Sequence, residues 1–222
     1  MTILEAKQIN KFYEQGNQTY HILKNISLTL NKGDFLGIVG PSGSGKTTLL
    51  YCLSGLESIE NGLITFNEKQ INLKDDKTLQ ELRKHDFGFV FQFFNLIPNL
   101  TVYENILVAQ VIANKHDDHK IMELLEQVGI AQYKDYYPDQ LSGGMQQRVA
   151  IARALVNDPK IIFADEPTGN LDQKNGKAIM DLLKKLNEEH NLTIILVTHN
   201  EDYLTYCTKT LTLIDGEMID ET

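Results

Sequence analysis

The chain has 222 residues, a formal net charge of −9 and two cysteines. This length accommodates one sizeable α/β domain, and the excess of Asp and Glu over Lys and Arg, 30 to 21, argues against a nucleic-acid-binding surface. No apolar stretch approaches the roughly 20 residues that span a bilayer, no signal peptide is predicted from the first residues, and the cysteines fit neither a disulfide framework nor a metal site, so we expect a protein of the reducing cytoplasm.

The first part of the chain predicts strands. Residues 3–9 and 22–30 alternate apolar and polar side chains, as half-exposed strands do. Residues 35–39 form a continuous apolar run, which is typical of a buried parallel strand. A helix is predicted from Lys46 to Ser54, where Gly55 ends it.

The middle of the chain predicts helices, because the periodicity becomes helical from residue 78 to about residue 131. Within this region Thr101–Glu104 fits a capping box, and Asp117 opens another amphipathic stretch. A further helix is expected over 142–155, with Ser142 as its N-cap.

Two apolar strand runs follow, at 161–164 and 192–197, with a helix predicted between them over about 175–189. Parallel strands joined by helices predict a doubly wound α/β sheet, whose chemistry lies at the carboxyl ends of the strands. We therefore expect the residues that directly follow predicted strands to meet at one edge of the sheet. These are Gly40, Asp165, Glu166 and His199.

Residues 40–47 read GPSGSGKT and fit the P-loop pattern G-x-x-x-x-G-K-[ST] at every fixed position. Such a loop wraps backbone N–H groups around nucleotide phosphates, places Lys46 among their oxygens and offers the Thr47 hydroxyl to Mg²⁺. A glycine-rich turn without function is the alternative. The predicted strand and helix on either side favour the P-loop.

Three side chains are candidates for the chemistry of hydrolysis. Asp165 ends a buried apolar run, which predicts a carboxylate presented to Mg²⁺ through water. Glu166 is expected to orient or deprotonate the attacking water, and His199 can reach the γ-phosphate and sense hydrolysis. A solvated strand end and a structural histidine are the alternatives, and the neighbouring P-loop favours the catalytic interpretation.

Gln92 lies where a strand gives way to the helical region. Its amide can bind Mg²⁺ or the attacking water and couple the nucleotide state to the next segment, or it is a surface glutamine. Residues 93–98 are unusually apolar, so they either pack under the helices or line a groove for a partner. Tyr13, in a polar segment, either stacks on a purine ring or is a partly buried tyrosine.

A second glycine pair opens the helix predicted at Ser142, within the segment Leu141–Arg148. A helix N-terminus with small residues is a ready anion site. Because the P-loop already binds phosphates, this second segment makes best sense as a phosphate clamp presented to another copy of the protein.

These segments together resemble the nucleotide-binding subunit of ATP-binding cassette (ABC) transporters over essentially the full length of the chain. The segments that match the family's motifs, in the expected order, are Tyr13 (A-loop), 40–47 (Walker A), Gln92 (Q-loop), 141–147 (signature), 161–166 (Walker B), 170–172 (D-loop) and His199 (switch histidine). Met145 departs from the glutamine that most often follows the signature glycines, whereas those glycines and Ser142 are intact.

The resemblance implies an α/β fold: a P-loop NTPase (RecA-like) core with an N-terminal antiparallel β subdomain and an inserted α-helical subdomain. It implies one ABC ATPase domain over 1–222, with the catalytic core and β subdomain at about 1–92 and 158–222 and the helical subdomain at about 93–157. It further implies an ATP-dependent, head-to-tail homodimer in which the signature of one copy completes the site of the other.

The resemblance also implies the site residues, in three groups. The residues assigned to ATP are Tyr13, Gly40, Ser42, Gly43, Ser44, Gly45, Lys46, Thr47, Thr48, Ser142, Gly143, Gly144 and Asp172. Those assigned to Mg²⁺ are Thr47, Gln92 and Asp165. Those assigned to catalysis are Glu166, His199 and Gln92.

Residues 93–105 and 169–172 look like the branch that contains lipoprotein-releasing, macrolide-exporting and cell-division ATPases. This branch implies an ATPase at the cytoplasmic face of the membrane, bound to a separate permease with a large extracytoplasmic domain and, through it, to a periplasmic or extracellular adaptor. We expect export or mechanical transmission of peptide, lipoprotein or drug substrates. Regulation of a signalling or cell-division complex is the alternative; an ABC ATPase acting on DNA or ribosomes is disfavoured by the single cassette and the acidic composition.

Overall fold

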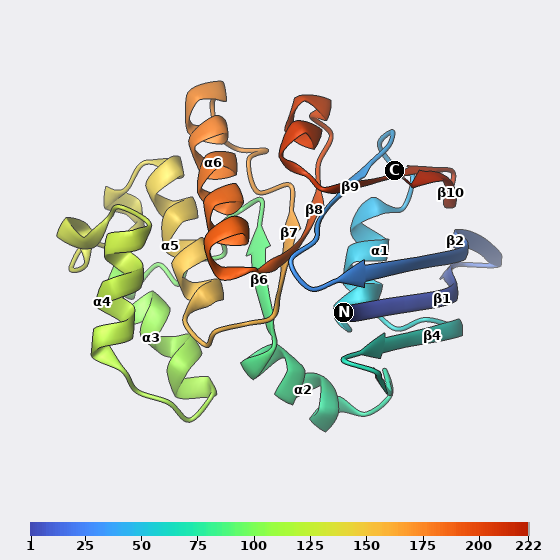
Figure 1. Ribbon diagram of the computed structural model, residues 1–222, viewed down its shortest axis with the longest axis horizontal. Coiled ribbons are helices and arrows are strands. Elements are labelled where there is room, and N and C mark those ends of the chain that lie inside the picture. Colours follow the sequence, from blue (N-terminus) through green and yellow to red (C-terminus); the bar gives the residue numbers. More distant parts are fainter. Residues whose placement is uncertain (222) are drawn as a thin grey trace.

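The computed structural model describes residues 1–221, and its N-terminal part forms a four-stranded antiparallel sheet in the order β2-β1-β4-β5. Its strands are β1 (Thr2–Gln15), β2 (Gln18–Asn31), β4 (Asn61–Phe66) and β5 (Lys69–Gln70). The two strands predicted from alternation are present and extend further than expected, whereas β4 and β5 are not among the predicted elements. Figure 1 shows β1, β2 and β4 side by side at one end of the molecule.

A six-stranded sheet in the order β10-β9-β3-β8-β7-β6 forms the centre of the fold. Its strands are β3 (Phe35–Val39), β6 (Phe87–Phe91), β7 (Ile161–Asp165), β8 (Thr193–Val197), β9 (Lys209–Ile214) and β10 (Glu217–Glu221). All neighbouring strands run parallel except β9 and β10. The predicted doubly wound sheet is confirmed, with β9 and β10 as additional strands.

The helices are α1 (Lys46–Leu53), α2 (Asp76–His85), α3 (Val102–Ile112), α4 (Asp118–Gln127), α5 (Gly143–Leu155) and α6 (Gln173–His190), with 3-10 turns at Ala131–Tyr133, Pro138–Gln140 and Glu201–Tyr206. Thr101 and Glu104 form the expected capping box, and Ser142 caps α5 through a hydrogen bond that its side chain accepts from Met145 N. The helical pattern expected from 78 to about 131 is interrupted by β6, which separates α2 from α3 and is the strand expected directly before Gln92. The apolar and aromatic residues of β6 pair with β7, and this pairing outweighs the helical periodicity around it.

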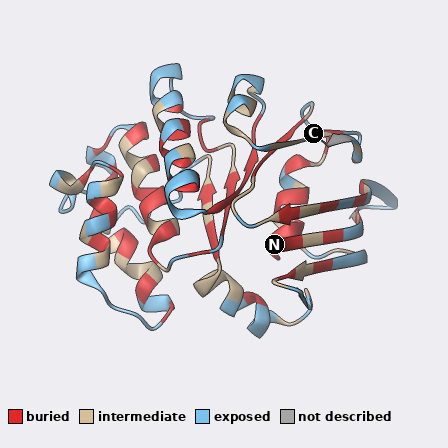
Figure 2. Cartoon of the chain, in the orientation of Figure 1, coloured by how far each residue is buried: buried red, intermediate tan, exposed pale blue. Residues whose placement is uncertain are grey.

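The central strands are buried on both faces. In β7, Ile161 and Phe163 belong to a core shared with α1 and the N-terminal sheet, whereas Ile162 and Ala164 belong to a second core shared with α3–α6. Figure 2 shows the buried residues concentrated along these strands and on the inner sides of the helices. Double burial explains why these strands read as continuous apolar runs rather than as alternating ones.

Helices α3, α4 and α5 gather on the side of the molecule away from the N-terminal sheet (Figure 1). All three lie within residues 93–157; the subdomain boundaries themselves remain a prediction. Among the helices of residues 1–221, none has both the length and the apolar character of a bilayer-spanning segment.

Candidate functional site

The predicted site residues meet at the carboxyl edge of the central sheet. Strands β3, β8 and β7 are consecutive in the sheet order, and they end at Val39, Val197 and Asp165. Because these strands run parallel, the loops that follow them begin side by side. Gly40, Glu166 and His199 are therefore brought to one edge, as the sequence predicts.

A pocket of about 330 Å³ opens at this edge. It is lined by Tyr13, Ile22, Ser42, Gly43, Gly45, Lys46, Thr47, Thr48 and Glu166. Tyr13 lies in β1 of the N-terminal sheet and is 40% exposed, so its ring is accessible from the pocket. The pocket thus combines most of the predicted phosphate-binding loop with the predicted aromatic platform.

The conformation of residues 40–47 requires glycine. Gly40 has φ +145°, and a Cβ atom there would lie 2.0 Å from the backbone oxygen of Leu213. Gly43 and Gly45 also have positive φ, a region that other residues adopt only at a cost. The conformation of this loop therefore depends on its glycines, whose contact with phosphate remains a prediction.

Lys46 is buried, with 9% of its surface exposed. Its Nζ donates hydrogen bonds to Gly40 O at 3.0 Å and to Pro41 O at 2.8 Å. These carbonyls carry no net charge, and the buried Ser44 Oγ has no hydrogen-bond partner within residues 1–221. A buried cation without a carboxylate and an unpaired hydroxyl fit the binding of an anion such as a nucleotide phosphate.

Both oxygens of the Asp165 carboxylate accept hydrogen bonds from α1. Thr47 Oγ1 donates to Oδ1 at 2.9 Å, and Tyr51 OH donates to Oδ2 at 2.9 Å. Burial of the phenol and its proximity to Asp165 raise the pKa of Tyr51 to about 12, so its hydroxyl is protonated at neutral pH. Tyr51 is absent from the predicted site, although it lies one helical turn after Thr47, a spacing that places both side chains on one face.

The oxygens of Thr47 and Asp165 are suitable for Mg²⁺. Residues 1–221 contain no cluster of three or more His, Cys, Asp or Glu side chains that could hold a metal by themselves. Mg²⁺ usually takes one or two protein oxygens and completes its shell with water and substrate phosphates. One carboxylate and one hydroxyl beside a P-loop fit that pattern.

Glu166 and His199 form a direct pair, with Glu166 Oε2 2.8 Å from His199 Nδ1. The Glu166 side chain is 18% exposed and that of His199 is 71% exposed. Glu166 has φ 47° and its backbone N–H donates to Val197 O at 3.0 Å. A left-handed non-glycine residue at a strand end is a strained conformation of the kind that occurs at functional sites.

Gln92 is bound to the loop that follows β7. Its Nε2 donates to Asn170 Oδ1 at 3.4 Å, and Asn170 Nδ2 donates to the Gln92 carbonyl at 2.9 Å. A Cβ atom at Gly169 would lie 2.8 Å from Gln92 Nε2. The structure therefore couples Gln92 to residues 169–170, and its role toward metal or water remains a prediction.

The signature segment lies at the N-terminus of α5 and does not contribute to the P-loop pocket within residues 1–221. A Cβ atom at Gly144 would lie 2.9 Å from Asn175 Oδ1. Asp172 caps α6 by accepting from Asn175 N at 2.9 Å and Asn175 Nδ2 at 2.6 Å, and these bonds, the backbone one first, lower the pKa of Asp172. Asn175 thus links the N-termini of α5 and α6, a contact that the sequence does not predict.

The apolar segment after Gln92 is partly packed and partly exposed. Leu96 packs against the core shared with α3–α6, whereas Phe93 and Ile97 are 73% and 42% exposed. Phe94 and Asn95 have positive φ. Packing under the helices therefore describes part of this segment, and a groove for a partner remains a prediction for its exposed part.

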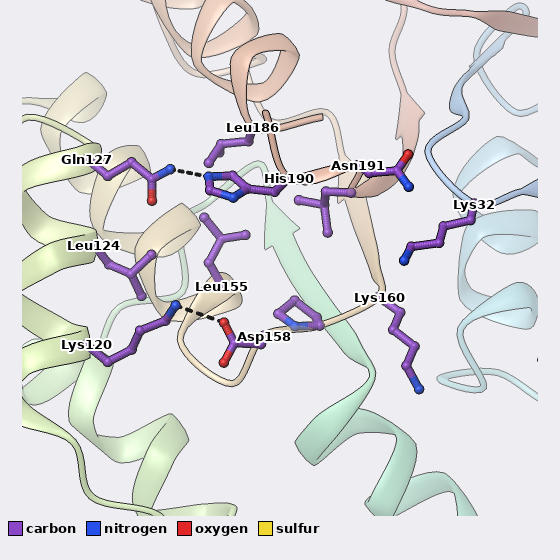
Figure 3. Close-up of a pocket in the computed structure, with 12 residues that line it drawn as sticks. Lys32, Lys120, Leu124, Gln127, Leu155, Asp158, Lys160, Leu186, His190 and Asn191 are labelled. Carbon is purple, nitrogen blue, oxygen red and sulfur yellow. Dashed lines mark hydrogen bonds and ion pairs between the residues drawn. The ribbon is translucent and has the colours of Figure 1, made fainter. Parts of the chain in front are cut away.

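A second pocket, of about 280 Å³, lies at the opposite edge of the sheet (Figure 3). Its lining includes Lys32, Lys160 and Leu192, which precede β3, β7 and β8, so it lies at the amino ends of these strands. Lys120 is paired there with Asp158 at 2.9 Å. None of the predicted site residues lines it.

Comparison with known proteins identifies a family. The model of the ABC transporter family matches residues 23–169. The lipoprotein-releasing system ATP-binding protein LolD of Legionella pneumophila is 40% identical over 219 residues, which are 97% of this chain and 96% of LolD. The macrolide export ATP-binding/permease protein MacB of Mannheimia succiniciproducens is 40% identical over 225 residues, and this chain spans 35% of its length.

Among solved structures, the chain resembles the dimeric structure of a post-hydrolysis state of the ATP-binding cassette MJ0796 bound to ADP and Pi, a protein of Methanocaldococcus jannaschii. The TM-score is 0.91 at 40% identity, and the match covers 99% of this chain and 98% of that one. At this identity and coverage the likeness extends beyond the fold to the whole cassette.

Proposed function

Because this chain belongs to the ABC transporter family and is an ATP-hydrolysing subunit of a transporter, we propose that it closes as a homodimer on two ATP molecules and thereby drives a separate membrane permease. The observation that carries this proposal is the arrangement of the Glu166–His199 pair and the Thr47–Asp165 pair beside the P-loop pocket. The first pair suits the activation of water, and the second suits the binding of a divalent cation.

In this mechanism the backbone N–H groups of residues 40–48 and the Lys46 ammonium hold the phosphates, while the ring of Tyr13 stacks on the base. Mg²⁺, held through Thr47 and Asp165, would supply charge neutralisation to the developing phosphate oxygens. The Glu166 carboxylate accepts the proton of the attacking water, and His199 Nδ1 holds that carboxylate in place. Gln92 is proposed to report the nucleotide state through Asn170.

The dimer completes each site with the signature segment of the other copy. Ser142 and Gly143 stand at the exposed N-terminus of α5, where N–H groups and the helix dipole favour an anion. Because this segment is absent from the P-loop pocket of its own chain, we propose that it approaches the γ-phosphate bound to the partner. Asp172, at the N-terminus of α6, is proposed to join the two sites.

The permease partner is proposed from the relatives and from one surface. Relatives are named for lipoprotein release and for macrolide export, the second as an ATP-binding/permease protein. The exposed side chains of Phe93 and Ile97 lie within five residues after Gln92 and offer an apolar contact for such a permease. We propose location at the cytoplasmic face of the membrane through this contact, with a permease that carries a large extracytoplasmic domain and engages an adaptor, and with peptide, lipoprotein or drug as cargo.

The test is the oligomeric state of Glu166→Gln protein, measured by size exclusion with light scattering in the presence and absence of Mg·ATP. This variant keeps the shape of the side chain but removes the base, so we expect ATP binding without turnover and an ATP-dependent shift from monomer to dimer. Glu126→Gln, on the exposed face of α4, is the matched control and should hydrolyse ATP at the normal rate. A Glu166→Gln protein that turned over ATP normally would remove Glu166 from the mechanism, and one that bound ATP but stayed monomeric would contradict the shared site.

A further inference from the structure

One carboxylate is fixed from two positions on the same helix. Asp165 accepts from Thr47 Oγ1 through Oδ1 and from Tyr51 OH through Oδ2, each at 2.9 Å. Thr47 and Tyr51 are separated by one turn of α1 and therefore project from one face of it. The carboxylate of β7 is thus held against α1 at both oxygens.

Tyr51 is anchored independently of Asp165. Its backbone carbonyl accepts from Ser54 Oγ at 3.1 Å, Leu56 N at 2.9 Å and Glu57 N at 3.1 Å. Its ring packs against the core shared by α1 and the N-terminal sheet. The phenol hydroxyl is therefore delivered to Asp165 from a rigid base.

Tyr51 also reaches Asp165 from outside the P-loop pocket. The lining of that pocket includes Thr47 but, within residues 1–221, not Tyr51. The oxygen of Thr47 has two possible partners, the carboxylate and a bound cation, whereas among residues 1–221 the hydroxyl of Tyr51 donates to the carboxylate alone. The bond from Tyr51 is thus suited to persist when Thr47 is engaged by a cation.

We propose that Tyr51 is a positioning residue that holds Oδ2 of Asp165, keeps Oδ1 directed toward Thr47, and so raises the affinity of the P-loop site for Mg²⁺. This inference rests on the proposed role of Asp165 at Mg²⁺. Hydrogen-bond partners of metal-binding carboxylates orient them, and removal of such a partner typically costs about 10–100-fold in metal affinity. Tyr51 does not touch the nucleotide in this scheme, so its effect should appear only when the cation is present.

The experiment measures the dissociation constant of the non-hydrolysable analogue AMP-PNP by calorimetry, once with Mg²⁺ and once with EDTA. The ratio of the two constants is the contribution of Mg²⁺ to binding. We expect Tyr51→Phe, which removes only the hydroxyl, to reduce this ratio by about tenfold and to leave the constant in EDTA unchanged. Tyr103→Phe is the matched control, because the Tyr103 hydroxyl also donates to an aspartate, Asp118, but at the helical side of the molecule; it should leave the ratio unchanged.

The outcomes separate this inference from the function on which it rests. A ratio for Tyr51→Phe equal to that of the unchanged chain overturns the role of Tyr51, as does an equal loss of affinity with Mg²⁺ and with EDTA, which would indicate a distorted P-loop. Asp165→Asn is measured in parallel. If Asp165→Asn lowers the ratio and Tyr51→Phe does not, only the positioning role is lost; if Asp165→Asn has no effect, the metal-binding role of Asp165 fails and the inference fails with it.

Discussion

His199 Nδ1 lies 2.8 Å from Glu166 Oε2, and this contact joins the loop after β8 to the first residue after β7. Glu166 is mostly buried and His199 mostly exposed, so the imidazole covers the carboxylate from the solvent side. The carboxylate is thereby held in one orientation at the edge of the P-loop pocket. The position of the Glu166 carboxylate is therefore fixed by its contact with His199 as well as by its own side-chain rotamer.

This relationship predicts the effect of His199→Ala. Loss of the imidazole frees the Glu166 carboxylate to rotate, so we expect the turnover number for ATP to fall by about 10²–10³-fold. The KM for ATP should change little, because His199 is not among the residues that line the P-loop pocket. Steady-state phosphate release measures both constants. His119→Ala, at an exposed position of α4, is the control, and equal turnover in the two variants would contradict the role of His199.

The shared site predicts complementation between two inactive proteins. Lys46→Ala removes the phosphate-binding ammonium of the P-loop, and Ser142→Arg obstructs the N-terminus of α5. In a mixed dimer, the intact P-loop of one chain faces the intact signature of the other, so one site of two is restored.

We expect each variant alone to be inactive and their mixture to regain ATPase activity, which is read from phosphate release at a series of mixing ratios. Mixing Lys46→Ala with Lys46→Ala/Ser142→Arg protein is the control, because no intact site can form in that mixture. Activity that stays at background in the first mixture would mean that the two segments do not meet across a dimer.

The sequence predicts well at which edge of the sheet the site lies, but it does not predict the side-chain contacts within the site. Gly40 directly follows a continuous apolar run, and Glu166 and His199 each lie two residues after the end of one. Such runs indicate buried parallel strands without further information. The hydrogen bond from Tyr51 to Asp165 depends on the distance between α1 and β7, which only tertiary packing sets. The same holds for Gln147, which is fully buried in α5 and donates to Phe91 O and Pro167 O.

The sequence signals of β9 and β6 differ in strength. Residues 209–214 read KTLTLI, in which polar and apolar side chains alternate, so the sequence does contain a pattern that predicts β9. A strand is expected directly before Gln92, but the limits of β6 are not predicted, because its pattern is short and the helical periodicity on both sides extends across it. Pairing with β7 decides its structure, and that pairing is not visible in the local sequence.

Arg153 stabilises the segment that follows Gln92, so its replacement should destabilise the fold. Arg153 is partly buried, which lowers the pKa of its guanidinium, and it donates to Asn95 O at 2.7 Å and Phe94 O at 2.9 Å. Arg153→Lys replaces a planar fork by a single ammonium, which cannot bond both carbonyls in the same geometry. We expect the free energy of unfolding to fall by about 1–3 kcal/mol in urea titrations.

Arg83→Lys is the matched control for this change, because within residues 1–221 Arg83 donates to one carbonyl, Gly55 O at 3.1 Å, and a lysine can replace a single bond. Its effect on the free energy of unfolding should be smaller than that of Arg153→Lys. Equal losses in the two variants would show that the two-carbonyl geometry at Phe94 and Asn95 does not matter to stability.

Asp172 predicts a pH-dependent stability. Its hydrogen bonds from the backbone and side chain of Asn175 lower its pKa in the folded state, so folding favours the ionised form. The resulting stabilisation is complete above the unfolded pKa of about 3.9 and is lost as the pH falls through the lower folded value. Asp172→Asn keeps a capping oxygen but removes the charge, so its free energy of unfolding should be lower than that of the unchanged chain at pH 7, and the difference should shrink below pH about 4.

Urea titrations of both proteins from pH 7 to pH 3 measure this difference directly. Asp117→Asn is the control, because Asp117 caps α4 in the same manner, through Lys120 N, whereas within residues 1–221 no side-chain amide is found to donate to its carboxylate. Asp172 should show the larger pH-dependent difference, because its two bonds from Asn175 both favour the carboxylate. A difference for Asp172→Asn that is constant across this pH range would mean that the charge does not contribute, and that Asp172 acts in the isolated chain only as a neutral cap.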